Sequence, residues 1–216
     1  MKTINLSEQP SLLNQFLKEL RSKDIQKDSM RFRRNIERIG EVAAYRISQS
    51  LNYHSQSIET PLAPMQIDTI SEPIVLATIL RAGLPFHQGF LNFFDNAENA
   101  FVSAYRQYSS PTEFTIHTEY IASPDLNGKT LIICDPMLAT GSSMETAYRA
   151  LLQKGTPAKV ILASVIATEK AIHFLEGVMP ADTVLYTAAI DPILNEHSYI
   201  VPGLGDAGDL AFGEKL

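Results

Sequence analysis

Short apolar runs of strand length alternate with helical stretches, and this pattern constrains the fold more than any other feature of the sequence. Two of the helical stretches span residues 141–154 and 169–177. Strands that are apolar throughout and alternate with helices are typical of a parallel sheet covered by helices on both faces. The sequence therefore predicts an α/β fold with a mostly parallel sheet, whose expected strands cover residues 74–80, 100–105, 130–134, 160–167 and 183–187.

Amphipathic helices are predicted before the first of these strands. Ser11 can cap a helix whose apolar residues share one face, and a second stretch of helical period runs from Phe32 to Leu51. The polar, proline-containing segment 55–64 suits a connection. Residues 111–127 break the strand–helix alternation, and we expect a protruding hairpin or lid there.

Length and composition exclude several classes of protein. A chain of 216 residues favours one domain, and its net charge of −6 argues against a nucleic acid as the main ligand. The single cysteine, Cys134, excludes an intramolecular disulfide framework and fits a reducing compartment. The first thirty residues are too polar for a signal peptide, and no run of 18 apolar residues occurs. We expect a cytoplasmic protein with no membrane partner.

Residues 131–143 hold the strongest functional motif. An apolar strand ends at Asp135, a loop of small residues and hydroxyls follows, and a helix begins. Backbone N–H groups at the helix start, with the hydroxyls of Thr140, Ser142 and Ser143, form a potential phosphate cradle. Asp135 follows a strand where open α/β sheets bind ligands, and its carboxylate can accept hydrogen bonds from sugar hydroxyls. On the pattern alone, a purely structural role as a turn cap explains Asp135 equally well. The motif lacks both the P-loop ending and GxGxxG, which disfavours ATP hydrolysis and a dinucleotide fold.

The segment from Asp135 to Ser143 resembles the 5-phosphoribosyl 1-diphosphate (PRPP) signature of type I phosphoribosyltransferases. Its Asp-Pro-Met-Leu-Ala-Thr-Gly form is similar to that of the uracil phosphoribosyltransferase family. The resemblance covers about residues 72–214, and the carboxyl-terminal run is the part specific to the uracil branch. The other segments that resemble the family, in the expected order, are Ile-Leu-Arg-Ala-Gly-Leu at 79–84, Tyr105-Arg106, the run 185–209, and Phe212-Gly213.

The resemblance implies an enzyme of pyrimidine salvage that converts uracil and PRPP to UMP and diphosphate. It assigns catalytic roles to Asp135, Asp206, Arg81 and Arg106. In this assignment the loop 139–143 holds the 5-phosphate, Asp135 binds the ribose, and the two arginines bind the diphosphate. The PRPP-binding residues that the resemblance implies are Arg81, Arg106, Asp135, Pro136, Met137, Leu138, Ala139, Thr140, Gly141, Ser142, Ser143 and Asp206.

The resemblance places uracil at Ile200, Gly205, Asp206 and Ala207. Uracil presents an acceptor, a donor and an acceptor along O2, N3 and O4, whereas cytosine inverts two of these. Backbone groups in a fixed loop can make that discrimination, since a mismatched base leaves buried polar groups unpaired. The resemblance also implies Mg²⁺ as cofactor, held mainly through PRPP with Asp206 as the candidate protein contact.

The expected layout is one phosphoribosyltransferase domain over residues 1–216. It divides into a helical segment at 1–60, a PRPP-binding core at 72–188, a lid at 106–127 and a uracil-binding loop region at 189–216. The core is expected to be a sheet flanked by helices, and the last region a hood over the base.

Several positions depart from the family pattern. Gln9-Pro10-Ser11 stands where the family has His-Pro-Leu, and Leu210 stands where a basic residue is common. Ser142 stands where the family usually has a second glycine of the phosphate loop. Gln107 stands where an acidic residue is common, and Ser198 replaces the glycine of the family's Asn-Glu-His-Gly-Tyr. These departures indicate a divergent branch of the family.

Two rival functions stay open on the sequence alone. One is a phosphoribosyltransferase for another base, which the carboxyl-terminal run disfavours. The other is a catalytically weak or inactive regulator with the same fold that senses PRPP or UMP. If such a regulator binds RNA, the net negative charge argues against it and the basic cluster at residues 31–38 argues for it. A homodimer or larger homo-oligomer is expected, because the amino-terminal helices must bury an apolar face. GTP activation and UTP inhibition stay open.

Overall fold

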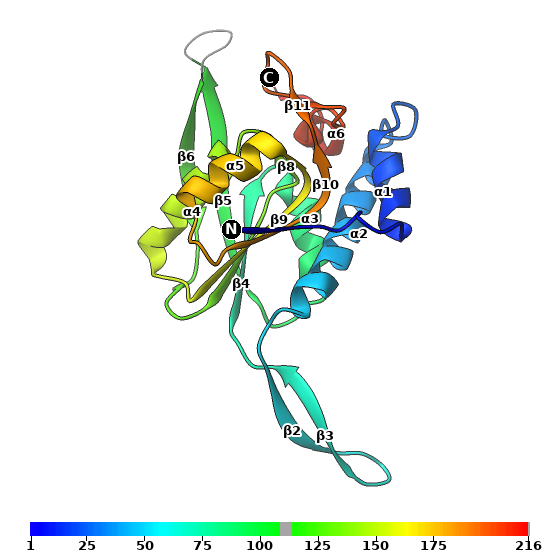
Figure 1. The fold of residues 1–216 in the computed structure, drawn as a ribbon, viewed down its shortest axis with the longest axis vertical. Helices are drawn as coiled ribbons and strands as arrows, with labels where there is room; N and C mark the ends of the chain where they lie inside the picture. Colours follow the sequence, from blue (N-terminus) through cyan, green and yellow to red (C-terminus); the bar gives the residue numbers. More distant parts are fainter. Residues whose placement is uncertain (109–113, 216) are drawn as a thin grey trace.

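A computed structural model describes residues 1–108 and 114–215, and it describes side chains outside 104–119 and 216. Its centre is an eight-stranded sheet in which six of the strands follow the order β1, β10, β9, β7, β4, β5 through parallel pairs (Figure 1). β6 adds an antiparallel edge beside β5, and the two-residue β8 pairs with β9. The strands of this sheet are β1 (Lys2–Asn5), β4 (Ile74–Leu80), β5 (Glu98–Tyr108), β6 (Phe114–Ala122), β7 (Thr130–Cys134), β8 (Met137–Leu138), β9 (Lys159–Thr168) and β10 (Val184–Asp191).

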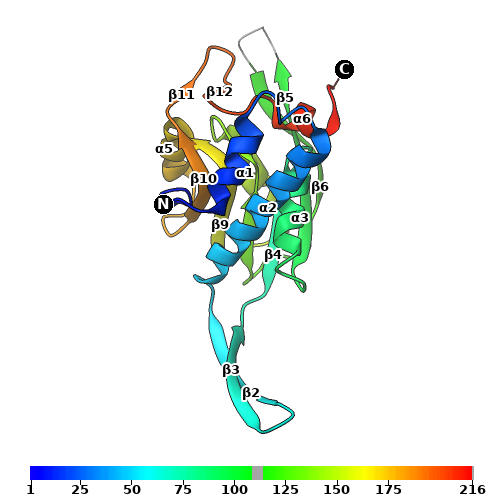
Figure 2. The same ribbon diagram turned by 90° about the vertical axis from the view of Figure 1, so that its right-hand side faces the viewer.

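Helices cover both faces of the sheet, as Figure 2 shows for one of them. One face carries α1 (Leu12–Arg21), α2 (Ser29–Ser48) and α3 (Gly83–Leu91). The other carries α4 (Ser142–Leu151), the short 3-10 helix η1 (Leu152–Lys154) and α5 (Glu169–Val178). Because side chains alternate along a strand, each buried strand serves two cores. In β7, Ile132 and Cys134 pack in the core under α1–α3, whereas Leu131 and Ile133 pack in the core under α4 and α5.

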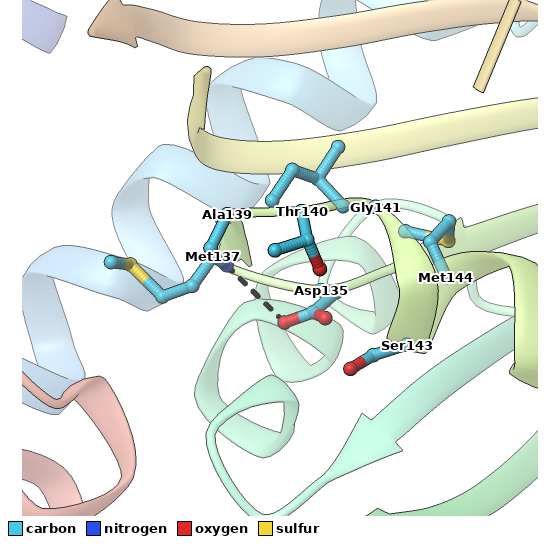
Figure 3. A pocket seen from close by; sticks show the side chains of 8 residues that line it. Asp135, Met137, Ala139, Thr140, Gly141, Ser143 and Met144 are labelled. Carbon is cyan, nitrogen blue, oxygen red and sulfur yellow. Dashed lines mark hydrogen bonds between the residues drawn. The ribbon is translucent and has the colours of Figure 1, made fainter. Parts of the chain in front are cut away.

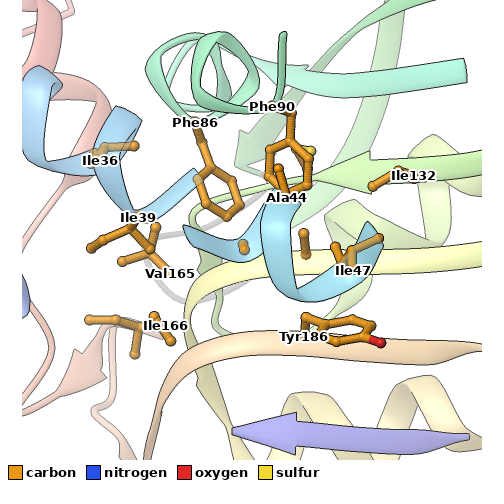
Figure 4. Packing of buried hydrophobic residues seen from close by; sticks show 14 of the residues in the cluster. Ile36, Ile39, Ala44, Ile47, Phe86, Phe90, Ile132, Val165, Ile166 and Tyr186 are labelled. Atoms are coloured by element: carbon orange, nitrogen blue, oxygen red, sulfur yellow. The ribbon is translucent and has the colours of Figure 1, made fainter. Parts of the chain in front are cut away.

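The helix pair α2 and α3 approaches very closely because two glycines face each other. A Cβ on Gly40 would lie 2.5 Å from the carbonyl oxygen of Phe86, and one on Gly89 would lie 2.1 Å from that of Glu37. This approach lets Phe86 and Phe90 of α3 reach the core between α2 and the sheet (Figure 4). Both rings are fully buried and pack edge to face, with centroids 5.3 Å apart. Side-chain packing of this kind, more than helix propensity, stabilises such helices.

The structure differs from the sequence prediction in the segment before β4. A connection was expected over 55–64, but β2 (Tyr53–Glu59) and β3 (Pro64–Ile70) form an antiparallel hairpin that projects from the body (Figure 1). Every residue of β2 is exposed, so this strand has no buried face, and its sequence carries no alternating apolar pattern. The expected helical segment 1–60 thus contains two helices but begins and ends with strands.

The fold-class prediction is confirmed: the sheet is mostly parallel and helices flank it.

After β10 the chain forms a small hairpin of β11 (Ile193–Leu194) and β12 (Ile200–Val201), then α6 (Ala207–Phe212). These elements lie at the same end of the sheet as the β5–β6 extension (Figure 1). No helix in the described part of the chain is long and apolar enough to cross a membrane.

Gly89→Ala is expected to lower the free energy of unfolding by about 2 kcal/mol, because its methyl group would collide with helix backbone rather than with a movable side chain. Gly177→Ala on α5 is the matched control, since a Cβ built there meets no described atom within 4 Å beyond its chain neighbours and the backbone of its own helix. We expect the control to match or exceed wild-type stability. Chemical denaturation of both variants measures the difference, and equal stabilities would contradict this account of the α2–α3 contact.

His87 is expected to make stability depend on pH. The residue is 3% exposed, its Nε2 lies 2.8 Å from Asn99 Oδ1, and its Nδ1 has no hydrogen-bond partner among the described residues. Burial lowers the pKa of His87 below its ordinary value, and the Asn99 hydrogen bond opposes this only in part. The unfolded chain therefore binds a proton at His87 more readily than the folded chain does. The contribution of neutral His87 to the free energy of unfolding is complete above the pKa that His87 has in the unfolded chain, and it is lost as the pH falls below that pKa.

The free energy of unfolding, measured between about pH 7 and pH 5, checks this expectation. His87→Gln removes the titrating ring and retains a polar group near Asn99. We expect a shallower loss of stability with acidification in this variant than in wild type. Identical slopes would show that His87 does not contribute.

Candidate functional site

The loop after β7 is the centre of the candidate site. Asp135 follows Cys134, is 9% exposed, and its Oδ1 accepts a hydrogen bond from the backbone N–H of Met137 at 3.2 Å. The loop then returns beside β9, where Met137 pairs with Ile166. Asp135 thus shapes the loop as well as facing the hollow in Figure 3. The residues that line the hollow are Asp135, Met137, Leu138, Ala139, Thr140, Gly141, Ser143 and Met144.

Gly141 permits the turn from this loop into α4. It is the N-cap residue of α4 and has a φ of 83°, a left-handed conformation that favours glycine. A Cβ here would also lie 2.9 Å from Phe174 and 3.1 Å from Leu175 of α5. Gly141 offers no side-chain oxygen to the first N–H groups of α4, and such groups favour a bound anion.

Hydroxyl groups fix the loop from both sides of Gly141. Thr140 Oγ1 accepts from the backbone N–H of Ser142 at 3.3 Å and lies 3.1 Å from Ser142 Oγ. Thr168 Oγ1 donates to the Ala139 carbonyl at 2.7 Å and accepts from Ala171 N at 3.0 Å. Thr168 therefore ties the loop to the start of α5.

Ser142 is compatible with its position. It is the first residue of α4 and does not have a positive φ, in contrast to Gly141 before it. The replacement of the family's second glycine by Ser142 therefore introduces no left-handed strain.

The turn after β4 approaches the β7 strand end closely. A Cβ on Gly83 would lie 2.2 Å from Thr78 Oγ1 and 3.3 Å from the Cys134 carbonyl oxygen. This contact lets α3 start directly over the strand ends. Arg81 precedes this turn, and its side chain is 40% exposed.

The structure brings Arg81 against the carboxyl-terminal segment. Its Nη2 lies 2.9 Å from Asp209 Oδ1, and its Nη1 donates to the Gly213 carbonyl at 3.3 Å. A Cβ on Gly208 would lie 3.6 Å from Arg81 Nη2 and 3.2 Å from Asp206 Oδ1. Arg81 and Asp206, which are distant in sequence, thus flank the same glycine.

Two glycines shape the segment between β12 and α6. Gly203 has a φ of 56°, and a Cβ there would lie 2.1 Å from the Ile200 carbonyl oxygen. Gly205 is exposed and has a φ of 93°, while Ile200 and Ala207 are buried. Asp206 caps α6, because its Oδ1 accepts from the backbone N–H of Asp209 at 3.0 Å.

Asn195 organises the tight turn between β11 and β12. Its Oδ1 accepts from the backbone N–H groups of His197 and Tyr199, at 3.0 and 2.9 Å. Ser198 within this turn has a φ of 59°, so the position where the family has glycine requires a left-handed backbone.

Cys134 is a packing residue in this structure. It is fully buried in the core under α1–α3. Burial, with a smaller effect of the Asp135 charge, raises the pKa of its thiol well above the ordinary value. A neutral thiol is a poor nucleophile.

The structure places most residues predicted for the site at the carboxyl end of the sheet. Residues 135–143 form one continuous loop, and Ile200, Gly205, Asp206 and Ala207 lie in the segment that meets Arg81. Arg106 belongs to β5, but its side chain lies outside the described residues, as does that of Gln107. The sequence prediction missed Arg21, Gln26 and Arg33, which bind the carboxyl-terminal segment and carry no motif.

A mostly parallel sheet, with a loop of small residues and hydroxyls between β7 and the start of α4, is the architecture expected of an α/β protein of the type I phosphoribosyltransferase class. The model of the uracil phosphoribosyltransferase family matches residues 7–214. A uracil phosphoribosyltransferase of Porphyromonas gingivalis is 59% identical over 216 residues, covering 100% of both chains. One of Methanothermobacter thermautotrophicus is 39% identical over 188 residues, covering 86% of this chain and 85% of its own.

Solved structures share the fold. The AQ2163 protein from Aquifex aeolicus superposes with a TM-score of 0.87 at 28% identity, covering 98% of both chains. TT1426 from Thermus thermophilus superposes with a TM-score of 0.51 at 16% identity, covering 84% of this chain and 90% of its own, a likeness of fold alone. The chain belongs to the uracil phosphoribosyltransferase family.

Ser198→Gly is expected to raise the free energy of unfolding by about 1 kcal/mol, because glycine adopts the left-handed conformation without the Cβ penalty. Thermal denaturation of wild type and variant measures the shift. Ser55→Gly on the exposed strand β2 serves as the control for serine-to-glycine replacement without a positive φ, and it should not stabilise. A destabilised Ser198→Gly would contradict the strain at this turn.

Proposed function

We propose that this chain transfers the phosphoribosyl group of PRPP to N1 of uracil, giving UMP and diphosphate. The observation that carries the proposal is the family match over residues 7–214, which spans both the phosphate loop and the carboxyl-terminal segment. The Arg81–Asp209 contact supports it, because it joins the turn after β4, which we assign to the diphosphate, to the carboxyl-terminal segment at one end of the sheet.

In this proposal the loop 139–143 holds the 5-phosphate. The N–H groups at the start of α4 and the hydroxyls of Thr140, Ser142 and Ser143 supply donors, and Gly141 gives the phosphate close access to backbone. The rest of the PRPP-binding loop consists of Pro136, Met137 and Leu138, which set its backbone course. Asp135 contributes to this course by accepting the backbone N–H of Met137.

Asp135 binds the ribose hydroxyls and favours the positive charge that develops on the ring as the bond to diphosphate breaks. Arg81 binds the leaving diphosphate, whose negative charge a guanidinium fork matches. We assign Arg106 to the same diphosphate from the lid side. No covalent intermediate is needed, which agrees with the buried, neutral Cys134.

The segment from Ile200 to Ala207 binds uracil through its backbone. The left-handed glycines at 203 and 205 give this segment a fixed, irregular course whose N–H and C=O groups can match an imide edge. Orientation of N1 toward the ribose follows from those contacts. A base with the inverted pattern leaves buried backbone groups unpaired, which is the basis for rejecting cytosine.

Mg²⁺ fits this site as an ion that arrives with the substrate. The described residues contain no group of three metal-ligating side chains. Mg²⁺ commonly keeps several waters and binds substrate phosphates with one or two carboxylates. Asp206 is the carboxylate we assign to it, and when bound the ion would neutralise charge on the diphosphate.

We further propose a cytoplasmic homodimer or larger homo-oligomer, with GTP as a candidate effector. The lone, reduced Cys134 supports a reducing compartment.

The alternative function is a regulator with this fold that senses PRPP or UMP without efficient turnover. No observation on the site favours that alternative over catalysis.

The test is formation of labelled UMP from labelled uracil, PRPP and Mg²⁺. Uracil-dependent UMP formation supports the proposal. Absence of turnover, with PRPP or UMP still bound in calorimetry, would overturn it in favour of the regulator.

Arg81→Ala and Asp206→Asn are each expected to lower kcat by about 10²-fold or more, because each removes charge that acts on the diphosphate. Both variants should stay folded. The Arg81–Asp209 pair is partly exposed to solvent, where ion pairs contribute little stability, and Asn at 206 can still cap α6. Arg149→Ala, which breaks the exposed pair with Glu145, is the control and should retain wild-type turnover. Wild-type rates at saturating substrates in both site variants would remove Arg81 and Asp206 from the site.

A further inference from the structure

Arg21, the last residue of α1, binds the end of β10 through a two-pronged ion pair. Its Nη1 lies 2.8 Å from Asp191 Oδ2, and its Nη2 lies 2.8 Å from Asp191 Oδ1. The Asp191 side chain is 6% exposed and that of Arg21 is 25% exposed, so the pair is largely withdrawn from water. Parallel N–H···O bonds of this kind fix orientation as well as distance.

The same pair closes the base of the loop 191–203. Asp191 Oδ2 also accepts the backbone N–H of Gly203 at 2.9 Å, and Arg21 Nη1 also donates to the Gly203 carbonyl at 3.1 Å. Both backbone groups of Gly203 are therefore held, one by each member of the ion pair. The loop between the two anchor points carries the β11–β12 hairpin.

Gly203 transmits this restraint to the segment assigned to uracil. Its Cα lies so close to Ile200 that a Cβ would approach the Ile200 carbonyl oxygen to 2.1 Å. On the other side, Gln26 Nε2 donates to the Leu204 carbonyl at 3.0 Å and to the Leu20 carbonyl at 2.7 Å. The backbone from Ile200 to Leu204 is thus anchored to the end of α1 and the residues that follow it.

We propose that Arg21 is a positioning residue for the base: acting through Asp191 and Gly203, it holds the backbone of the Ile200–Ala207 segment in the geometry that pairs with uracil. The inference rests on the proposed uracil-transferring function and deepens it. Arg21 itself does not touch the base or PRPP in this assignment. We expect loss of Arg21 to affect the carboxyl-terminal segment alone. Among the described residues, the hydrogen bonds of Arg21 go to Asp191 and Gly203, and none goes to the phosphate loop 135–143.

A backbone that must pair with three polar groups at once is sensitive to small shifts, because hydrogen bonds weaken steeply with misalignment. Loss of the guanidinium fork releases the Gly203 carbonyl, and it leaves Asp191, which still accepts from the Gly203 N–H, without its two bonds to Arg21. The prediction is a selective loss of uracil affinity. The phosphate loop 135–143 and Arg81 lie on other elements, and the Asp206 carboxylate is held separately as the cap of α6, so the PRPP contacts should keep their strength.

The test is steady-state kinetics of Arg21→Lys, measured as UMP formation with uracil and PRPP varied separately. Lysine keeps the positive charge beside Asp191 but cannot make the two-pronged contact and the Gly203 contact together. We expect KM for uracil to rise about tenfold, while KM for PRPP and kcat change by less than about threefold. Arg31→Ala is the matched control: it breaks an ion pair with Glu19 in the same helical layer without touching the loop, and both KM values should stay at wild-type levels.

Thermal denaturation of each variant separates positioning from stability. A merely structural role predicts a lower melting temperature with the two KM values unchanged or shifted together. Either that pattern or an unchanged uracil KM in Arg21→Lys, with active wild type, would overturn the positioning role alone. A wild-type protein that forms no UMP would overturn the proposed function, and this inference with it.

Discussion

The parallel alignment of β4, β7, β9 and β10 is the constraint on which the rest of the structure depends. Parallel strands all end at one edge, so the turns that follow them converge there. The turn after β4 carries Arg81, the loop after β7 carries Asp135, and the chain after β10 leads into the candidate base segment. The phosphate, sugar and base contacts that the proposed reaction requires can therefore come from sequence segments more than 50 residues apart, from 81 to 207.

Close backbone approach packs the turns at this edge of the sheet against their neighbours. Gly83 places the start of α3 directly against Thr78, and Gly141 places the start of α4 against α5. A side chain at either position would push a helix away from the sheet edge. The amino-terminal helices contribute in a different way: Arg21, Gln26 and Arg33 donate to Gly203, Leu204 and Ala211, respectively, so the helical layer also anchors the segment that follows β12.

The sequence predicted the features that local pattern encodes. β4 and β7 are apolar throughout because both faces are buried, and the loop 135–143 combines a strand end, small residues and a helix start within one short motif. The hairpin β2–β3 was missed because β2 has no alternating apolar pattern and neither strand has a buried face. The Arg21–Asp191 pair was missed because its partners are 170 residues apart and neither residue type is unusual at its position. Contacts of that kind depend on tertiary structure and leave no local signal.

The measurement that tests the central claim most directly is base selectivity. Labelled uracil, cytosine, hypoxanthine and orotate are each incubated with the protein, PRPP and Mg²⁺, and nucleotide formation is compared at equal concentrations. If the backbone between Ile200 and Ala207 recognises the imide edge, uracil is converted to UMP, and cytosine and hypoxanthine are not converted at a comparable rate. Orotate has the same imide edge with an added carboxylate, so its conversion reports on the shape of the pocket instead. Conversion of cytosine or a purine base as fast as uracil would contradict the assignment of this segment and of the reaction.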